Sequence, residues 1–205
     1  MVDRTAIAIL AKAPLPGLAK TRLIPVLGAE GAAALAAQLI GRAVATACAA
    51  DTGPVTLWTT PDAEHPLFQG MRRQFGVKLA RQPDGDLGAR MLAAVQAANG
   101  RVLVIGTDCP ALTVDHLRNV AEVLRGYDAA LIPAEDGGYV LIGLRRPQPA
   151  LFSGISWGSP AVAAETRWLL SAHDLTWREL PPLWDVDAPD DVERLRRDGF
   201  GALLG

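Results

Sequence analysis

The sequence predicts an α/β fold in which a mostly parallel sheet carries helices on both faces and includes one antiparallel pair of strands. Short apolar runs alternate along the chain with helical stretches of about 10 to 20 residues, which is the pattern of βαβ units. The apolar runs at 129–135 and 138–144 are the exception, because only Asp136 and Gly137 separate them. A link this short cannot make a parallel crossover, so these two strands are expected to be antiparallel or sharply bent.

The individual elements follow from the spacing of apolar residues. Strands are predicted at residues 5–11, 54–60, 77–82, 101–108, 129–135 and 138–144. The run at 101–108 is the most hydrophobic and is expected at the centre of the sheet. Helices are predicted at residues 29–50, 63–75, 87–98, 113–124, 159–172 and 189–197. Thr113 suits the N-cap of its helix, and Ser159 followed by Pro160 is typical of a helix start.

Length, charge and cysteine content narrow the class of protein. The chain of 205 residues is expected to form a single domain, residues 1–205, with a core that needs no disulfide or metal. Its 20 Lys and Arg against 22 Asp and Glu give a net charge of -2, which argues against a nucleic-acid-binding protein. Cys48 and Cys109 lack the spacing of a zinc site. No apolar run approaches the roughly 18 residues of a membrane span, so a cytoplasmic protein without a transmembrane segment is expected. The sequence does not indicate the oligomeric state.

A basic loop follows the first strand, at the sheet edge where ligands bind in open α/β folds. Residues 12–22 contain no acidic residue but hold three cations and a stiff turn, namely Lys12, Lys20, Arg22, Pro14 and Gly17. This composition suits a polyphosphate, although a solvated basic loop would look the same. The spacing argues against a Walker A motif, which requires glycine where this chain has Pro14 and Ala19. Proline also has no N–H to donate to a phosphate.

Two acidic segments are candidates for metal binding. Asp108 lies at the carboxyl end of the central strand, where an α/β enzyme would place a metal-binding carboxylate; an ordinary turn before Pro110 is the alternative. Residues 184–191 carry four aspartates and no base, and their D-V-D sequence looks like the D-x-D of metal-dependent glycosyltransferases. Asp187 or Ala188 could equally cap the helix that follows, and the two roles are compatible.

Two further motifs have competing interpretations. Asp136-Gly137 is a strong hairpin signal, but Glu135 and Asp136 beside Gly137 and Gly138 could also accept the close approach of a ligand. Residues 154–158 match the G-x-S-x-G nucleophile elbow of serine hydrolases. That motif needs a preceding strand, and the proline-containing segment before it predicts none. A serine hydrolase is therefore not expected.

Several segments together resemble one bacterial family. They are AKAPLPGLAKTRL at 11–23, GTDCP at 106–110, PAEDGGYVLIGL at 133–144, ISWGSP at 155–160 with Thr166-Arg167 in the following helix, and WDVDAPDDVERL at 184–195. The chain resembles, over about residues 5–199, the radical-SAM/selenodomain-associated transferases. These are glycosyltransferase-like proteins of the nucleotide-diphospho-sugar transferase superfamily. More distant similarity connects it to the molybdenum-cofactor and phospholactate guanylyltransferases.

The resemblance implies a GT-A-type fold, a three-layer α/β/α arrangement with a Rossmann-like, mostly parallel sheet and one antiparallel strand. It implies that the loop after the first strand holds nucleotide phosphates, that Asp108 binds a metal, and that Asp187 completes the metal site. The chain departs from the related nucleotidyltransferases in one place. Lys12-Ala13-Pro14 stands where those proteins have a glycine-rich loop, which affects the identity and pose of the nucleotide.

The expected function is that of a metal-dependent, nucleotide-utilising transferase that acts on an unidentified small acceptor. Asp108 and Asp187 would hold Mg²⁺ or Mn²⁺, while Lys12, Lys20 and Arg22 would offset charge on the phosphates. Gly88 and Arg90 could contact the nucleotide. Asp136 is the candidate base or hydroxyl-holding group of the acceptor side, with its neighbours Glu135, Gly137 and Gly138 and with Trp157. Glycosyl transfer from a nucleotide-diphosphate sugar is favoured; nucleotidyl transfer from an NTP and a non-catalytic nucleotide-binding module are the alternatives.

Overall fold

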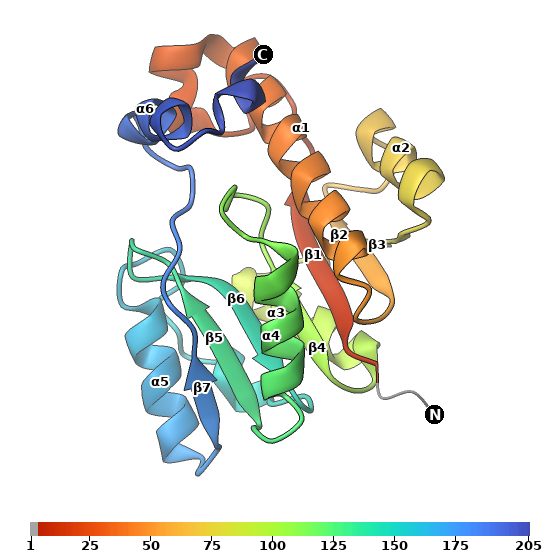
Figure 1. Ribbon diagram of the computed structural model, residues 1–205, viewed down its shortest axis with the longest axis vertical. Helices are drawn as coiled ribbons and strands as arrows, with labels where there is room; N and C mark the ends of the chain where they lie inside the picture. The colour runs from red at the N-terminus through yellow and green to blue at the C-terminus, as the bar shows by residue number, and fades with distance from the viewer. Residues whose placement is uncertain (1–3) are drawn as a thin grey trace.

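A seven-stranded sheet forms the centre of the molecule in the computed structural model, which describes residues 4–205 (Figure 1). The strands are β1 (Ala6–Lys12), β2 (Val55–Thr60), β3 (Lys78–Arg81), β4 (Val102–Ile105), β5 (Ala129–Pro133), β6 (Tyr139–Leu144) and β7 (Trp177–Glu179). Their order in space is β3-β2-β1-β4-β6-β5-β7. Only β6 runs antiparallel to its neighbours, β4 and β5, among the strands of residues 4–205. The predicted antiparallel pair and the central position of β4 are confirmed.

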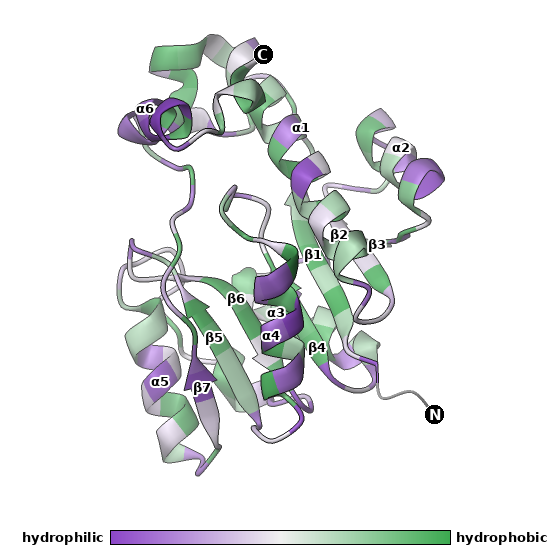
Figure 2. Ribbon diagram, in the orientation of Figure 1, coloured by the Kyte–Doolittle hydropathy of each residue, from purple (hydrophilic) through white to green (hydrophobic). Residues whose placement is uncertain are grey.

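Helices cover both faces of this sheet. They are α1 (Ile24–Ala50), α2 (Pro66–Phe75), α3 (Leu87–Ala98), α4 (Val114–Val123), α5 (Val162–Ala172) and α6 (Pro189–Arg197). Alternate residues of β1 point to opposite layers, so Ile7 and Ile9 pack with α1, α2 and α4, whereas Ala8 packs with α3 and α5. Figure 2 shows the strands as mostly hydrophobic ribbons between these layers. The predicted α/β/α fold class is confirmed.

The element boundaries agree with the sequence except at a few ends. Thr113 caps α4 as predicted, through a hydrogen bond that its side chain accepts from the His116 amide. The predicted start of α5 at Ser159 is wrong, because the helix begins at Val162 and the Ser159 hydroxyl accepts a hydrogen bond from the Ala161 amide instead. The short strand β7 and the 3₁₀ turns η1 (Thr21–Leu23), η2 (Pro149–Phe152) and η3 (Gly201–Leu204) were not predicted.

Helix α1 is the longest element of the described chain, and it is kinked near its start. Gly28 has a left-handed φ of 70°, and the regular helix follows it, close to the predicted start at residue 29. Residues 21–50 are long and apolar enough, by composition, to cross a membrane. In this fold, however, Ile40, Val44 and Ala47 pack in the core with the sheet and α4. Burial against the sheet therefore accounts for their apolar character.

A small unit lies over the carboxyl end of the sheet, and we refer to residues 20–39 and 184–204 as the cap unit. It contains η1, the first half of α1, α6 and η3, which lie together at the top of Figure 1. Its apolar cluster is separate from the two layers that cover the sheet and is centred on buried residues from both segments: Leu23, Ala32, Leu35, Leu39, Trp184, Val186, Val192 and Leu195. The first and last parts of the chain thus meet above the edge of the sheet where parallel strands end.

Candidate active site

A cleft of about 470 Å³ lies between the cap unit and the carboxyl ends of β1 and β4. It is lined by four cationic side chains, two carboxylates, and polar and apolar residues from both parts: Lys12, Lys20, Arg22, Arg90, Asp108, Asp187, Leu10, Ala11, Leu18, Ala19, Thr21, Ala36, Ile40, Thr60, Gln82, Leu87, Gly106 and Thr107. The edge of the sheet predicted for function is therefore the edge that carries this cleft.

The basic loop after β1 forms one wall of the cleft. The ammonium of Lys12, the last residue of β1, donates a hydrogen bond of 2.8 Å to the Leu18 carbonyl across the loop. Gly17 lies in the turn with a left-handed φ of 77°. Pro14 and Gly17, which were predicted to contact the nucleotide, shape the loop but do not line the cleft. The lining residues from this segment are instead Lys12 and residues 18–22.

Lys20 joins three segments that are distant in sequence. Its side chain is only 7% exposed, and its ammonium lies 2.8 Å from Oδ1 of Asp108. The same ammonium donates a hydrogen bond to the Val186 carbonyl. In return, the Val186 amide donates a hydrogen bond of 2.8 Å to the Asp108 backbone carbonyl. The basic loop, the end of β4 and the segment before α6 are thus fastened to one another at Lys20.

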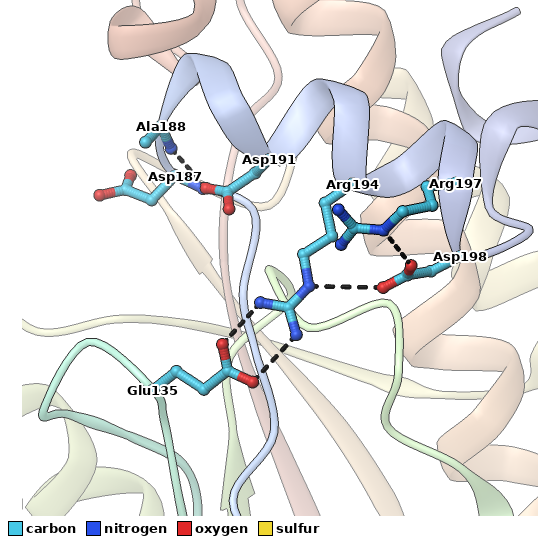
Figure 3. A network of polar contacts seen from close by, with 7 residues as sticks. All are labelled: Glu135, Asp187, Ala188, Asp191, Arg194, Arg197 and Asp198. Atoms are coloured by element: carbon cyan, nitrogen blue, oxygen red, sulfur yellow. Dashed lines mark hydrogen bonds and ion pairs between the residues drawn. The ribbon is translucent and has the colours of Figure 1, made fainter.

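A second ion pair, between Arg22 and Asp187, lies nearer the solvent. Both side chains are substantially exposed, at 73% for Arg22 and 48% for Asp187. Asp187 does not cap α6 with its side chain. The carboxylate of Asp191 instead accepts hydrogen bonds from the amides of Asp187 and Ala188, as Figure 3 shows. The Asp187 carboxylate is therefore left for the cleft, while Asp191 performs the capping.

Asp185 is a functional candidate that sequence reasoning did not select. The pKa of Asp185 is raised to about 6, chiefly by burial and also by the negative charges of Asp136 and Asp108. Lys20 opposes this effect. Asp185 therefore lies within electrostatic range of both the cleft and the turn at Asp136. The D-V-D sequence pointed to this residue as strongly as to Asp187, but only the structure shows which aspartate is withdrawn from water.

The two carboxylates of the cleft are suited to a divalent cation that takes its remaining ligands from a bound phosphate and from water. Asp108 and Asp187 line the same cleft. Within residues 4–205, no group of three or more His, Cys, Asp or Glu side chains is placed to hold a metal ion by itself. Mg²⁺ commonly takes one or two carboxylates and completes its shell with phosphate oxygens and water. These two carboxylates therefore suit a metal ion that binds together with a phosphate ligand, and they do not suit a structural metal site.

The residues predicted for the acceptor side lie outside the cleft lining and have other contacts. Glu135 makes a two-pronged ion pair with Arg194, with Nη1–Oε2 and Nη2–Oε1 distances of 2.5 and 2.9 Å (Figure 3). The Asp136 carboxylate accepts a hydrogen bond from the Gly138 amide and so closes the β5–β6 turn. Gly137, with a φ of 95°, lies so close to the Pro160 carbonyl that a Cβ would be 2.2 Å from it. The close approach expected at the glycines is thus made by the chain itself.

Gly88 and Trp157 pack against each other and not against the cleft. A Cβ at Gly88 would lie 2.4 Å from the Phe152 carbonyl and 2.6 Å from Nε1 of Trp157. Trp157 also meets Tyr139 edge-to-face, with ring centroids 6.4 Å apart. The glycine that opens α3 therefore allows the helix to pack on the segment before α5. Of the two residues predicted at this helix, only Arg90 lines the cleft.

Gln82 and Arg90 also line the cleft. The Gln82 side chain is buried, and its Nε2 donates hydrogen bonds to the carbonyls of Ala11 and Trp58 at 3.1 and 2.9 Å. Nε of Arg90 is buried and makes no hydrogen bond with the described residues. Gln82 was missed as a site residue, and the signal for it is its position immediately after a strand of the parallel sheet.

The G-x-S-x-G segment does not have a strand before it in the structure, as predicted. Ser156 Oγ donates a hydrogen bond of 2.9 Å to Oε1 of Glu165, and its amide donates one of 2.7 Å to Oε2. The preceding element is the 3₁₀ turn η2 and not a strand. A serine held by a carboxylate after a 3₁₀ turn lacks the strand–turn–helix setting of a nucleophile elbow.

The chain belongs to the family described as "Uncharacterized protein conserved in bacteria (DUF2064)", which matches residues 43–159. No curated protein matches the chain. Among solved structures, a protein from Desulfovibrio desulfuricans G20, provisionally named as a nucleotide-diphospho-sugar transferase, is 32% identical. The match covers 98% of this chain and 93% of that one with a TM-score of 0.85.

Two more distant structures share the fold. A nucleotidyl transferase from Methanothermobacter thermautotroptrophicus is 18% identical, with 97% and 98% of the two chains covered and a TM-score of 0.63. A CMP:2-keto-3-deoxy-manno-octonic acid synthetase complexed with CTP is 15% identical, with 97% and 99% covered and a TM-score of 0.59. The architecture is therefore that of nucleotide-diphospho-sugar transferases and related nucleotidyl transferases.

Proposed function

We propose that this protein is a nucleotide-utilising transferase that transfers a glycosyl group from a nucleotide-diphosphate sugar to a small acceptor. The observation that carries the proposal is the composition of the cleft, where Lys12, Lys20, Arg22 and Arg90 line the same space as Asp108 and Asp187. At the carboxyl edge of a parallel sheet, cations beside carboxylates suit a polyphosphate that carries a metal ion, because the cations can bind the phosphates and the carboxylates can bind the metal. The provisional name of the Desulfovibrio desulfuricans relative supports the same substrate class.

The proposed roles follow from the positions of these side chains. Lys12, Arg22 and Arg90 bind the phosphates and offset the negative charge that grows on the departing nucleoside diphosphate. Asp108 and Asp187 would hold Mg²⁺ or Mn²⁺, and when bound this ion supplies Lewis-acid stabilisation of the phosphate oxygens. Lys20 holds Asp108 in place from its buried position and adds positive charge to the site.

The acceptor is proposed to approach from the turn at residues 135–138. Asp136 lies outside the cleft lining, but its charge acts on Asp185, which also interacts with Asp108, and this electrostatic link supports a role for the turn beside the cleft. In the proposed reaction the acceptor oxygen forms a bond to the sugar carbon as the bond from that carbon to the diphosphate breaks. The acceptor proton passes to a carboxylate, for which Asp136 is the candidate, and the nucleoside diphosphate leaves.

The excess of positive charge in the cleft favours a second candidate, nucleotidyl transfer. Four cationic side chains and two carboxylates line the cleft, and a triphosphate carries more negative charge than a diphosphate and would use more of these cations. In this alternative a phosphorylated acceptor attacks the α-phosphate of an NTP and pyrophosphate leaves. Both reactions need the same cations and the same metal, so the products must distinguish them.

The experiment offers the protein a panel of NTPs and nucleotide-diphosphate sugars, with and without Mn²⁺, and follows thermal stability and products. A ligand at about 100 times its Kd stabilises the folded state by about 2.7 kcal/mol, which is easily detected. Stabilisation by nucleotide sugars with release of nucleoside diphosphate supports glycosyl transfer, whereas stabilisation by NTPs with release of pyrophosphate supports the second candidate. The matched variants are Asp108→Asn in the cleft and Asp190→Asn, an exposed residue outside it. A protein that none of these ligands stabilises would contradict the proposal.

A further inference from the structure

The cations and carboxylates of the cleft neutralise one another in the ligand-free protein. Lys20 is paired with Asp108 at 2.8 Å, and Arg22 is paired with Asp187. Two of the four cations that line the cleft are therefore paired with the two carboxylates that would bind a metal. Within each pair, neither side chain can accept a ligand of its own without leaving its partner unpaired.

A ligand that supplies only one kind of charge binds such a cleft at a disadvantage. A metal-free polyphosphate that reaches Lys20 also faces the Asp108 carboxylate, and like charges at short range repel. A metal ion alone that binds Asp108 leaves the ammonium of Lys20, whose side chain is 7% exposed, beside a second cation. A polyphosphate with a bound divalent cation supplies both charges, so each side chain exchanges one partner for another.

We propose that the Lys20–Asp108 and Arg22–Asp187 ion pairs make this cleft selective for polyphosphates that carry a divalent cation over the same polyphosphates without one. This inference rests on the proposed function and adds the specificity-determining residues of the phosphate site. Binding of the cation and of the anion is then coupled, because each makes room for the other. The aspartates act as a filter against bare phosphates as well as being candidate metal ligands.

The two ion pairs are expected to contribute unequally to the selectivity for metal-bound polyphosphate. The Lys20 side chain is 7% exposed and its ammonium contacts both the Asp108 carboxylate and the Val186 carbonyl, so it has less access to water than Arg22 when its carboxylate partner is removed. Arg22 is 73% exposed and can take up a solvated position. Lys20–Asp108 therefore carries most of the selectivity, and Arg22–Asp187 the smaller part.

Titration calorimetry of the full chain with inorganic pyrophosphate, with and without Mg²⁺, tests the inference. Pyrophosphate carries neither base nor sugar, so the result does not depend on which nucleotide is the substrate. The wild-type protein is expected to bind pyrophosphate at least about tenfold more tightly with Mg²⁺, which corresponds to 1.4 kcal/mol. Asp108→Asn frees Lys20 and is expected to bind metal-free pyrophosphate more tightly than the wild type and to lose most of the Mg²⁺ effect. Asp187→Asn should also tighten the binding of metal-free pyrophosphate and reduce the Mg²⁺ effect, but both changes should be smaller than in Asp108→Asn.

The matched control is Asp190→Asn, which removes an equal charge near the same helix but outside the cleft lining. Mg²⁺ forms complexes with pyrophosphate in solution to the same extent for every variant, so the comparison between variants isolates the protein. Circular dichroism and the melting temperature confirm that each variant is folded. If Asp108→Asn weakens metal-free binding, or leaves the Mg²⁺ effect unchanged, Asp108 does not act as a filter and the inference is overturned. Coupling without any transfer reaction would instead contradict only the proposed function.

Discussion

The sheet with its two covering layers and the cap unit above it are held together by different forces. In the sheet, the strands β4 and β5 are buried along their whole length, and their side chains enter apolar layers on both faces. The cap unit has a smaller apolar cluster and is fastened to the sheet by charged pairs, namely Lys20–Asp108 and Glu135–Arg194. Figure 2 shows the same contrast between hydrophobic strands and the hydrophilic helix α6.

The cleft therefore lies between the sheet, which is held by apolar packing, and the cap unit, whose polar contacts depend more on pH and salt. Apolar burial depends little on pH or salt, whereas the strength of exposed ion pairs depends on both. The sheet can therefore supply a fixed platform, and the polar contacts of the cap unit can exchange partners when a ligand arrives. If the two parts are this distinct, substitutions in the sheet and in the cap unit should differ in their effects.

The largest effect on overall stability is expected from Leu103→Ala in the centre of the sheet. Leu103 is fully buried in β4, so its truncation leaves a cavity and should lower the free energy of unfolding by about 2–5 kcal/mol. Denaturant titration measures this. The matched control, Leu87→Ala at the exposed start of α3, should stay within about 0.5 kcal/mol of the wild type. Equal effects of the two substitutions would show that β4 is not the stabilising centre.

A smaller effect on global unfolding is expected from Leu195→Ala in the cap unit. Leu195 is fully buried, but its neighbours belong to the separate cluster with Trp184 and Val186. The substitution should therefore open the cap unit locally. Hydrogen exchange is expected to quicken in α6 and η3 while the amides of β4 keep their protection. If the β4 amides lose protection to the same degree, the cap unit unfolds with the sheet and the distinction fails.

The sheet is also the part that the sequence predicts well, because its pattern is local. The apolar run of β4 and the helical spacing of α3 each lie within one segment, and the two-residue link at Asp136 already requires an antiparallel pair. The short edge strand β7 (Trp177–Glu179) escaped prediction because its three residues carry no apolar run, and only pairing with β5 makes it a strand.

The candidate site was predictable as a set of residue types but not as a set of contacts. The basic loop and Asp108 follow strands, so their shared position at one edge of the sheet could be foreseen. The partners could not, since Arg194 meets Glu135 across 59 residues of sequence and Lys20 meets Val186 across 166. The same holds for Gly137, whose close neighbour is the Pro160 carbonyl and not a ligand.

Gly137→Ala tests that contact on the sheet side of the boundary. Gly137 and Gly154 both have a left-handed φ, of 95° and 74°, but only Gly137 has backbone within reach of an added Cβ. Both substitutions should cost the strain of a left-handed alanine, and Gly137→Ala should cost about 1–3 kcal/mol more because the Pro160 carbonyl must move. Thermal unfolding of the two variants measures the difference. Equal costs would mean that the turn and α5 are not tightly apposed.

The smallest effect is expected from Glu135→Gln, which breaks the ion pair that ties α6 to the β5–β6 turn. Hydrogen bonding to Arg194 holds the pKa of Glu135 below its ordinary value, so the pair stabilises the folded state above that value and is lost as the pH falls through the lowered pKa. Because half of the Glu135 side chain is exposed, the loss at neutral pH should stay below about 1 kcal/mol and shrink in high salt. The wild-type and variant stabilities should then converge in acid.

Glu193→Gln, which breaks an ion pair within α6 alone, is the control and should leave hydrogen exchange in the β5–β6 turn unchanged. If the two variants behave alike, the contact between the cap unit and the sheet does not depend on Glu135.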